Sequence, residues 1–260
     1  MEERAQTAVE IARIGGGLAL EYFRRLDKLK IEDKGLQDFV SDADQAVERH
    51  VRNLIAAAFP EDGIVGEEEA AKPSQTGYTW VIDPIDGTAN FIAGIPVWAV
   101  VIAIVHDDET IVGVTFDPVH DEMFVAQRGL GAQLNRENLV CPKHLTVDRG
   151  SIGIGFARRA PSMQTVAVIS KVLELGGVFH RNASGALSLA YVAAGRLNGF
   201  IEGHMNAWDC LAGQLLVSEA GGRTEEQSAN SMIASGGRVI AASEGVFGTL
   251  VDIGDACYTP

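Results

Sequence analysis

The chain has 260 residues, of which 47% are hydrophobic, and its formal net charge is −14. This length and apolar content suit one large domain or two closely packed lobes, and they exclude a disordered chain. The acidic balance argues against non-specific binding to nucleic acid or to anionic membranes, because both require surfaces rich in Lys and Arg.

The cysteines and the N-terminal stretch indicate a compartment. Cys141, Cys210 and Cys257 are odd in number and lack Cys-x-x-Cys spacing, which is typical of a reducing cytoplasm without a disulfide framework. The first residues, MEERAQTAVEIARIGG, contain no signal-peptide apolar region, and the longest apolar run, 97–105, is shorter than the ~18–20 residues that span a bilayer. We therefore expect a soluble cytoplasmic protein.

The first half of the chain predicts helices followed by an antiparallel sheet. Apolar residues recur at helical spacing over 2–27. A second helix is expected over 41–59, with Ser41 as N-cap and Asp44 completing a capping box. From residue 80 onward, β-rich runs alternate with Asp/Pro/Gly turns, which predicts an antiparallel meander.

Beyond about residue 140, strands and helices alternate. We expect strands at 151–157, 177–181, 198–203 and 238–242, and helices at 161–175, 188–197, 208–222 and the C-terminal end. This alternation predicts a layered α/β lobe. No linker is evident, so we expect a single domain of two lobes, about 1–138 and 139–260.

The stretch WVIDPIDGTANF, residues 80–91, ends an apolar strand with two carboxylates. Pro84 favours a turn that brings Asp83 and Asp86 toward one point and exposes the carbonyl of Ile85. Oxygen ligands of this kind suit Mg²⁺, and two like charges so close require a cation between them. The residues therefore indicate a metal site, with a solvated surface turn as the alternative.

Three further features adjoin this motif. The amides of Gly87 and Thr88 stand at an expected helix start, which is a ready anion site. Glu67 lies in GIVGEEEAA, and Asp209 begins an amphipathic helix beside Trp208. Taken alone, Glu67 suits a solvated acidic run and Asp209 suits a helix cap.

The segments Gly66–Glu68, WVIDPIDGTANF and WDCLAGQLLVSEAGG, in this order and spacing, resemble the inositol monophosphatase family of Mg²⁺-dependent, lithium-sensitive phosphatases. The resemblance covers most of the chain. It implies an α/β (α+β) fold, a layered αβαβα sandwich of the inositol monophosphatase or sugar phosphatase type, usually a homodimer. It also implies two or three Mg²⁺ ions, for which Mn²⁺ or Ca²⁺ substitutes in crystals.

The resemblance assigns roles residue by residue. The metal ligands it implies are Glu67, Asp83, the carbonyl of Ile85, Asp86 and Asp209. Thr88 orients the attacking water with Asp44 as its partner, and Glu67 shares in catalysis. The pattern KGLQDFVSDAD places Lys34 near the site. The phosphate- and substrate-binding residues it implies are Lys34, Gly87, Thr88, Ser184, Gly185 and Glu202.

The residues expected to contact the substrate include one match to the family pattern and one departure from it. Glu202 stands where inositol-hydrolysing relatives place a glutamate that accepts hydrogen bonds from ring hydroxyls; the alternative is an exposed strand-end glutamate. When Ser184 is aligned with the [ST] position, the family pattern R-x-x-G-[ST]-A-A is altered in RNASGAL, with Ala183 at the glycine and Gly185 at the first alanine, while Ser184 keeps its hydroxyl. We therefore expect the backbone that touches the sugar to be shifted.

The leading hypothesis is a Mg²⁺-dependent phosphomonoesterase that hydrolyses inositol monophosphate to inositol and phosphate with metal-activated water. Its expected partners are a small phosphate ester and a second copy of the chain, without nucleic acid or membrane. A histidinol-phosphate or fructose-1,6-bisphosphate phosphatase is the alternative, and a bisphosphate gains support if an arginine from Arg158, Arg159 or Arg181 reaches the cleft. A non-catalytic regulatory binding protein is the alternative of another class.

Overall fold

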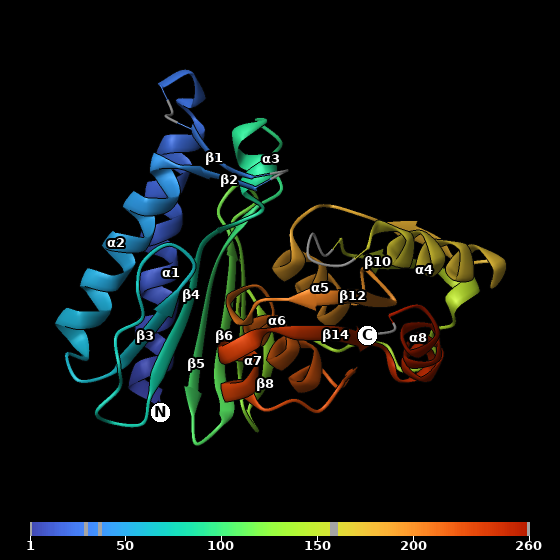
Figure 1. The fold of residues 1–260 in the computed structure, drawn as a ribbon. Coiled ribbons are helices and arrows are strands. Elements are labelled where there is room, and N and C mark those ends of the chain that lie inside the picture. Colours follow the sequence, from blue (N-terminus) through green and yellow to red (C-terminus); the bar gives the residue numbers. More distant parts are fainter. Residues whose placement is uncertain (1, 29–30, 36–37, 157–160, 259–260) are drawn as a thin grey trace.

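Helices and sheets alternate through the molecule in layers (Figure 1). The computed structural model describes residues 2–28, 31–35, 38–156 and 161–258, and for residues 28, 31–35 and 38–40 it describes the backbone alone. A seven-stranded sheet lies between two helix layers, and a five-stranded sheet follows before a last helix pair. The helices, in the order of the layers, are α1 (Glu2–Phe23) and α2 (Asp42–Ala58), then α5 (Gly185–Ala193) and α6 (Ala207–Glu219), then α4 (Ser162–Glu174) and α8 (Glu244–Cys257). This arrangement confirms the predicted αβαβα sandwich.

The larger sheet contains the predicted meander, with one parallel strand added at one edge and two short antiparallel strands at the other. β3 runs parallel to β4, and every later neighbouring pair is antiparallel. Its strands, in spatial order, are β3 (Gly63–Gly66), β4 (Thr79–Asp86), β5 (Ala99–His106), β6 (Glu109–Asp117), β7 (Glu122–Gln127), β8 (Gly131–Leu134) and β9 (Glu137–Asn138).

Both faces of this sheet are buried in its central strands. Because successive side chains point to opposite faces, Trp80 and Ile82 pack with α1 and α2, while Val81 and Ala103 pack with α5 and α6. A strand covered on both faces is apolar at every position. This explains the unbroken run from 97 to 105 in the sequence.

The smaller sheet is mixed. β10 is parallel to β11 and β12, whereas β14 is antiparallel to β12 and β13. Its strands, in spatial order, are β11 (Val178–His180), β10 (Ser151–Ile154), β12 (Gly199–Met205), β14 (Gly237–Ala242) and β13 (Arg223–Thr224).

Some element boundaries differ from the sequence predictions. The helix expected at 188–197 is α5 and begins at Gly185, because the Ser184 hydroxyl accepts a hydrogen bond from the amide of Leu187 at 3.2 Å and caps it. The expected helix 2–27 ends at Phe23 and is followed by a 3₁₀ turn, Leu26–Lys28. The elements that sequence patterns did not predict are β1 (Ile31–Gly35), β2 (Asp38–Ser41), β3, β8, β9, β13, α7 (Ala229–Ser235) and the 3₁₀ turn Val147–Arg149.

The middle helix layer packs against both sheets. Residues of α5 and α6 share one apolar cluster with β5 of the larger sheet and with β12 and β14 of the smaller one. The larger sheet ends with β9 at Asn138, and the smaller sheet begins with β10. The division into lobes at residue 138 stays a prediction. No helix among the described residues is long and apolar enough to cross a membrane.

Two glycines let α6 approach its neighbours closely. A Cβ atom at Gly113 in β6 would lie 2.6 Å from the carbonyl oxygen of Ala212 in α6. A Cβ atom at Gly213 in α6 would lie 2.5 Å from the Cβ of Leu189 in α5. These close approaches set the depth at which α6, and therefore Asp209 in its first turn, lies over the sheet.

We expect Gly113→Ala to lower the free energy of unfolding by ~1–3 kcal/mol, because the new methyl group overlaps α6 backbone that cannot move aside alone. Urea unfolding measures this change. The matched control is Gly17→Ala on α1, where an added Cβ meets no atom within 4 Å. It is expected to be neutral or stabilising by up to ~1 kcal/mol. Equal losses in both variants would contradict the role given to Gly113.

Candidate active site

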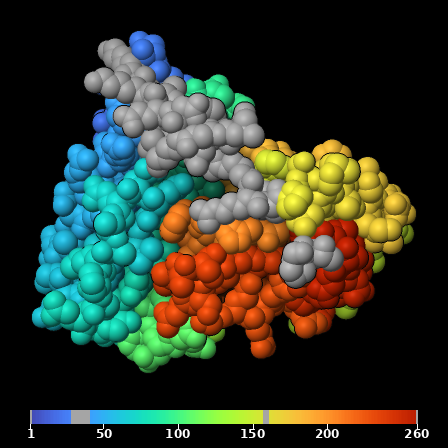
Figure 2. Space-filling model, viewed as in Figure 1, coloured from blue at the N-terminus to red at the C-terminus, as the bar shows by residue number. Residues whose placement is uncertain are grey.

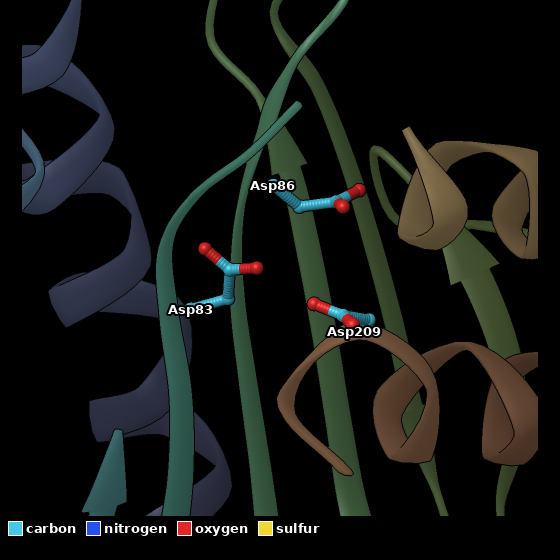
Figure 3. A group of neighbouring side chains, drawn as sticks. All are labelled: Asp83, Asp86 and Asp209. Carbon is cyan, nitrogen blue, oxygen red and sulfur yellow. The ribbon is translucent and has the colours of Figure 1, made fainter. Parts of the chain in front are cut away.

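The end of β4 directs two aspartates toward the same side. In a regular strand, residues three apart face opposite sides of the sheet. Here Asp83 pairs with Val101 but Asp86 pairs with Ala99, so the register shifts between the two acids. The amide of Ile85 donates a hydrogen bond to Asp83 Oδ1 at 2.9 Å and holds the turn. Both carboxylates consequently face one cavity (Figure 3).

Asp209 completes an acidic group from a distant part of the chain. It lies in the first turn of α6, where its Oδ2 accepts hydrogen bonds from the amide of Asn206 at 3.2 Å and from Asn206 Nδ2 at 3.3 Å. One carboxylate oxygen each of Asp83, Asp86 and Asp209 lies within 4.8 Å of the other two. Figure 3 shows the three side chains directed toward a common space.

The N-terminus of α5 holds Asp86 in place. The Ser184 hydroxyl donates to Asp86 Oδ2, and the amide of Ala186 donates to the same oxygen at 2.9 Å. Ser184 is 1% exposed. The structure therefore gives its hydroxyl a positioning task inside the protein, and its contact with substrate stays a prediction.

The altered motif RNASGAL keeps a glycine-like backbone. Ala183 has φ 62°, in the left-handed region that favours glycine. Gly185 lines the cavity, and a Cβ atom there would overlap the terminal methyl of Met205. Met205 thus fills the space beside Gly185.

Thr88 and Asp44 form the predicted pair. Thr88 Oγ1 lies 3.1 Å from Asp44 Oδ1 and 3.1 Å from the carbonyl oxygen of Ile85, and it can donate its proton to either. Asp44 Oδ2 accepts from the amide of Ser41 at 2.9 Å and from its hydroxyl at 2.6 Å. The predicted capping box is confirmed, and the same carboxylate reaches Thr88.

A cavity of about 520 Å³ gathers nearly all the predicted site residues. Those lining it are Glu67, Asp83, Ile85, Asp86, Gly87, Thr88, Ser184, Gly185, Glu202 and Asp209. Asp44 is 1% exposed and reaches the site through Thr88. Lys34 belongs to β1, and its side chain lies outside the described residues.

Sequence reasoning missed several lining residues. Asn90 in α3 (Thr88–Ile92) donates from Nδ2 to the carbonyl oxygens of Val97 and Asn182, both at 2.7 Å, and so joins the two sides of the cavity. Its position inside WVIDPIDGTANF was the available signal.

Arg181 is exposed and lines the cavity, while 158 and 159 lie outside the described residues.

Burial raises the pKa values of three site acids, and neighbouring carboxylates add to the shift at Asp83 and Asp86. Burial raises the pKa of Asp83 well above its ordinary value of 3.8, and the charges of Glu67, Asp86 and Asp209 raise it further. Burial and then Asp209 raise the pKa of Asp86 to about 7, against the hydrogen bonds from Ser184 and Ala186. Burial also raises the pKa of Asp44. A cation among these groups would relieve this cost.

The donor set suits a hard divalent cation. Five carboxylates line the cavity, and Arg181 is the one cationic side chain among its described lining residues. Those residues include no His and no Cys, which disfavours zinc. Carboxylate and carbonyl oxygens are the ligands that Mg²⁺ and Mn²⁺ accept.

A family model described as the inositol monophosphatase family matches residues 1–252. The chain belongs to this family. Its fold and the acids of its cavity agree with the resemblance found in the sequence motifs, and membership supports phosphatase chemistry with a bound metal.

Relatives and solved structures agree with this placement. The chain is 34% identical to the Nus factor SuhB of Haemophilus influenzae, over 93% of this chain and 92% of the relative. It is 36% identical to the Nus factor SuhB of Escherichia coli, over 94% and 92%. The extragenic suppressor protein suhB of Bartonella henselae superposes with a TM-score of 0.88 at 30% identity over 97% of each chain. An IMPase of Thermotoga maritima superposes with a TM-score of 0.87 at 26% identity over 98% of each.

Stripped of divalent cations, this family member should lose thermal stability as the pH rises from about 4 to about 7. In this window an unfolded Asp86, with a pKa near 3.8, has released the proton that the folded protein still holds with a pKa of about 7. Raising the pH therefore favours the unfolded state. Asp86→Asn cannot ionise, so it should flatten the dependence in thermal melts recorded with EDTA.

The control for this pH series is Asp252→Asn, an exposed aspartate on α8. It should follow the wild-type curve within error. Identical slopes for wild type and Asp86→Asn would show that Asp86 ionises normally in the folded protein.

Proposed function

We propose that this protein is a Mg²⁺-dependent phosphomonoesterase that hydrolyses inositol monophosphate to inositol and phosphate. The observation that carries the proposal is the convergence of Asp83, Asp86 and Asp209 within 4.8 Å, in a cavity that also contains Thr88. Family membership supports the reaction class.

The carboxylates would hold the metal. Asp83, Asp86 and Asp209 offer one oxygen each, and Glu67 enters the same cavity from the end of β3. Bound Mg²⁺ supplies Lewis-acid chemistry: it lowers the pKa of water and offsets the negative charge that develops during ester hydrolysis. Two or three ions and the carbonyl of Ile85 as a ligand remain part of the proposal.

Thr88 would orient the attacking water. Its single proton is directed to Asp44 or to the carbonyl of Ile85, so its oxygen lone pairs are available to accept a hydrogen bond from water. Asp44, fixed by two hydrogen bonds from Ser41, keeps Thr88 in this orientation. A water held this way is positioned for attack rather than left to diffuse.

The substrate would lie between α3 and β12. Gly87 has φ 101°, and a Cβ atom there would lie 3.0 Å from the carbonyl oxygen of Val97, so glycine is required at this turn. The amides of Gly87 and Thr88 are proposed to hold the phosphate. Glu202, across the cavity, would accept hydrogen bonds from the hydroxyls of a polyol.

Phosphate release from myo-inositol 1-phosphate tests the reaction. We expect turnover with Mg²⁺ and none with EDTA. Asp86→Asn should lower kcat/KM by about 10²-fold or more, because several kcal/mol of charge stabilisation are lost. Asp252→Asn, the same exchange at an exposed position, should retain wild-type rates. A metal-independent rate, or full activity in Asp86→Asn, would contradict the proposal.

A panel of phosphate esters tests whether the preferred substrate is a polyol monophosphate such as inositol monophosphate. We expect inositol monophosphate to give a higher kcat/KM than histidinol phosphate or fructose 1,6-bisphosphate, since Glu202 repels a second phosphate. Glu202→Ala should lower kcat/KM for inositol monophosphate by roughly 10–100-fold, because a charged acceptor is lost.

The bisphosphate reading rests on Arg181, which lines the cavity. It would gain support if fructose 1,6-bisphosphate were the better substrate and Arg181→Ala weakened it selectively. In that case the assignment of Glu202 to a polyol would be wrong.

A non-catalytic binding protein remains the alternative of another class. The curated relatives are named Nus factor SuhB, and this name denotes no phosphatase. The predicted absence of a nucleic-acid partner is not supported by the comparisons and stays a prediction. A wild-type protein that binds Mg²⁺ but hydrolyses no phosphate ester would favour this alternative.

A homodimer is also proposed, and the surface supports it. β11 is an edge strand of the smaller sheet, and Val178 and Phe179 on it are exposed. Met163 and Val166 of α4 are exposed as well, and α4, in yellow, forms part of the outer surface in Figure 2. Apolar side chains beside a strand edge suit burial against a second copy. Lithium sensitivity and a cytoplasmic location stay predictions from the resemblance and the sequence.

A further inference from the structure

Glu48 is a fully buried carboxylate on α2 that takes no part in the chemistry described above. Its side chain is 0% exposed and does not line the cavity. A buried charge is costly unless it is paired and hydrogen-bonded. Its partners therefore indicate what the residue does.

The hydrogen bonds that Glu48 accepts lead to the segment that follows Glu67. Glu48 Oε2 accepts a hydrogen bond from the amide of Glu68 at 2.8 Å, and Oε1 accepts from the amide of Glu69 at 2.9 Å. Arg52, one turn along α2, donates from Nε to Glu48 Oε1 at 2.8 Å.

Arg52 makes further hydrogen bonds to the same segment. Its Nη2 donates to the carbonyl oxygen of Glu69 at 2.8 Å, and its Nη1 donates to that of Ala70 at 3.2 Å. The ion pair thus binds both donors and acceptors of the backbone just after Glu67. The segment after Glu67 has no regular secondary structure, and these charge-assisted hydrogen bonds fix it to α2.

The residue before Glu67 contacts the same carboxylate. A Cβ atom at Gly66 would overlap the Glu48 carboxylate, so only glycine lets the chain pass this close. Glu48 is therefore packed against the chain before Glu67 and hydrogen-bonded to the chain after it.

Among the four carboxylates proposed as metal ligands, each of the three aspartates is held by a neighbouring group. The amide of Ile85 holds Asp83, Ser184 holds Asp86, and Asn206 holds Asp209. Glu67 alone among the four projects from a segment outside helix and strand. Its orientation depends on how that segment is fixed.

We propose that Glu48, with Arg52, is a positioning residue that presents Glu67 to the divalent cation. This inference rests on the proposed function, in which Glu67 is a metal ligand. A buried ion pair adds little stability over an apolar pair of the same volume. A geometric task accounts for its presence at this place.

Metal binding without substrate tests the proposal. Mn²⁺ titration followed by EPR measures affinity directly. Glu48→Gln, which keeps the shape but turns one acceptor into a donor facing a backbone amide, should weaken Mn²⁺ binding about 10–100-fold. At saturating Mg²⁺ the variant should recover most of its kcat, with KM for the ester near wild type.

Arg49→Ala is the matched control. Arg49 is the next residue of α2, is 65% exposed, and pairs with the Glu69 side chain at 3.5 Å instead of with the backbone. It should bind Mn²⁺ as wild type does. A folded Glu48→Gln protein with wild-type affinity would overturn the proposal, as would an equal loss in Arg49→Ala.

Gly66→Ala serves as a second variant if Glu48→Gln does not fold. Its methyl group would displace the Glu48 carboxylate without removing the charge, and the same loss of affinity is expected. Unchanged affinity in this variant would refute the positioning role. If the wild-type protein itself binds no Mn²⁺, the proposed function fails first, which separates the two outcomes.

Discussion

The repulsion between carboxylates in one buried cavity is the constraint on which this structure depends. Two unit charges 4.8 Å apart repel by ~3 kcal/mol at an effective dielectric constant of about 20, and Asp83, Asp86 and Asp209 meet at or within that distance. Left alone, the group relieves the repulsion by holding protons, as the raised pKa values of Asp83 and Asp86 indicate. With a divalent cation between them, all three acids can ionise. The fold must therefore keep mutually repelling groups together until the cation arrives.

The layered architecture meets this requirement by taking the acids from two separate supports. Asp83 and Asp86 come from the irregular end of β4, and Asp209 comes from the first turn of α6. α6 lies against the larger sheet at Gly113, so the separation between the two supports is set by close packing that charge repulsion cannot easily expand. Hydrogen bonds from Ile85, Ser184 and Asn206 then fix the direction of each carboxylate. Packing thus sets the distance, and local donors set the orientation.

The sequence predicted the parts of this arrangement that local chemistry dictates. The meander, the capping box of Ser41 and Asp44, and the carboxylate turn at 83–86 follow from periodicity and turn propensity. Joining Glu67 and Asp209 to that turn required the family resemblance, because each alone suits a solvated acid or a helix cap. The anchors were not predictable: Glu48 meets the amides of Glu68 and Glu69 only through the tertiary fold, and no sequence period marks such contacts. The start of α5 at Gly185, earlier than predicted, was also missed. Its cap, Ser184, has a hydroxyl that donates a hydrogen bond to the distant Asp86 as well as capping the helix.

The departure at Ala183 is best explained by the neighbours that hold it. An alanine in the left-handed region costs ~1–2 kcal/mol, and such strain persists only where surrounding contacts determine the backbone. Here the carbonyl oxygen of Asn182, the residue before it, accepts a hydrogen bond from Asn90. The hydroxyl of Ser184, the residue after it, donates a hydrogen bond to Asp86. Because those bonds retain a glycine-like conformation, the expected shift of the backbone is not needed to accommodate the alanine. At the second altered position, Gly185, the side chain of Met205 fills the space that a methyl group would take. Any change in substrate preference that this motif causes should therefore be sought in the shape of the wall and not in the metal-binding carboxylates.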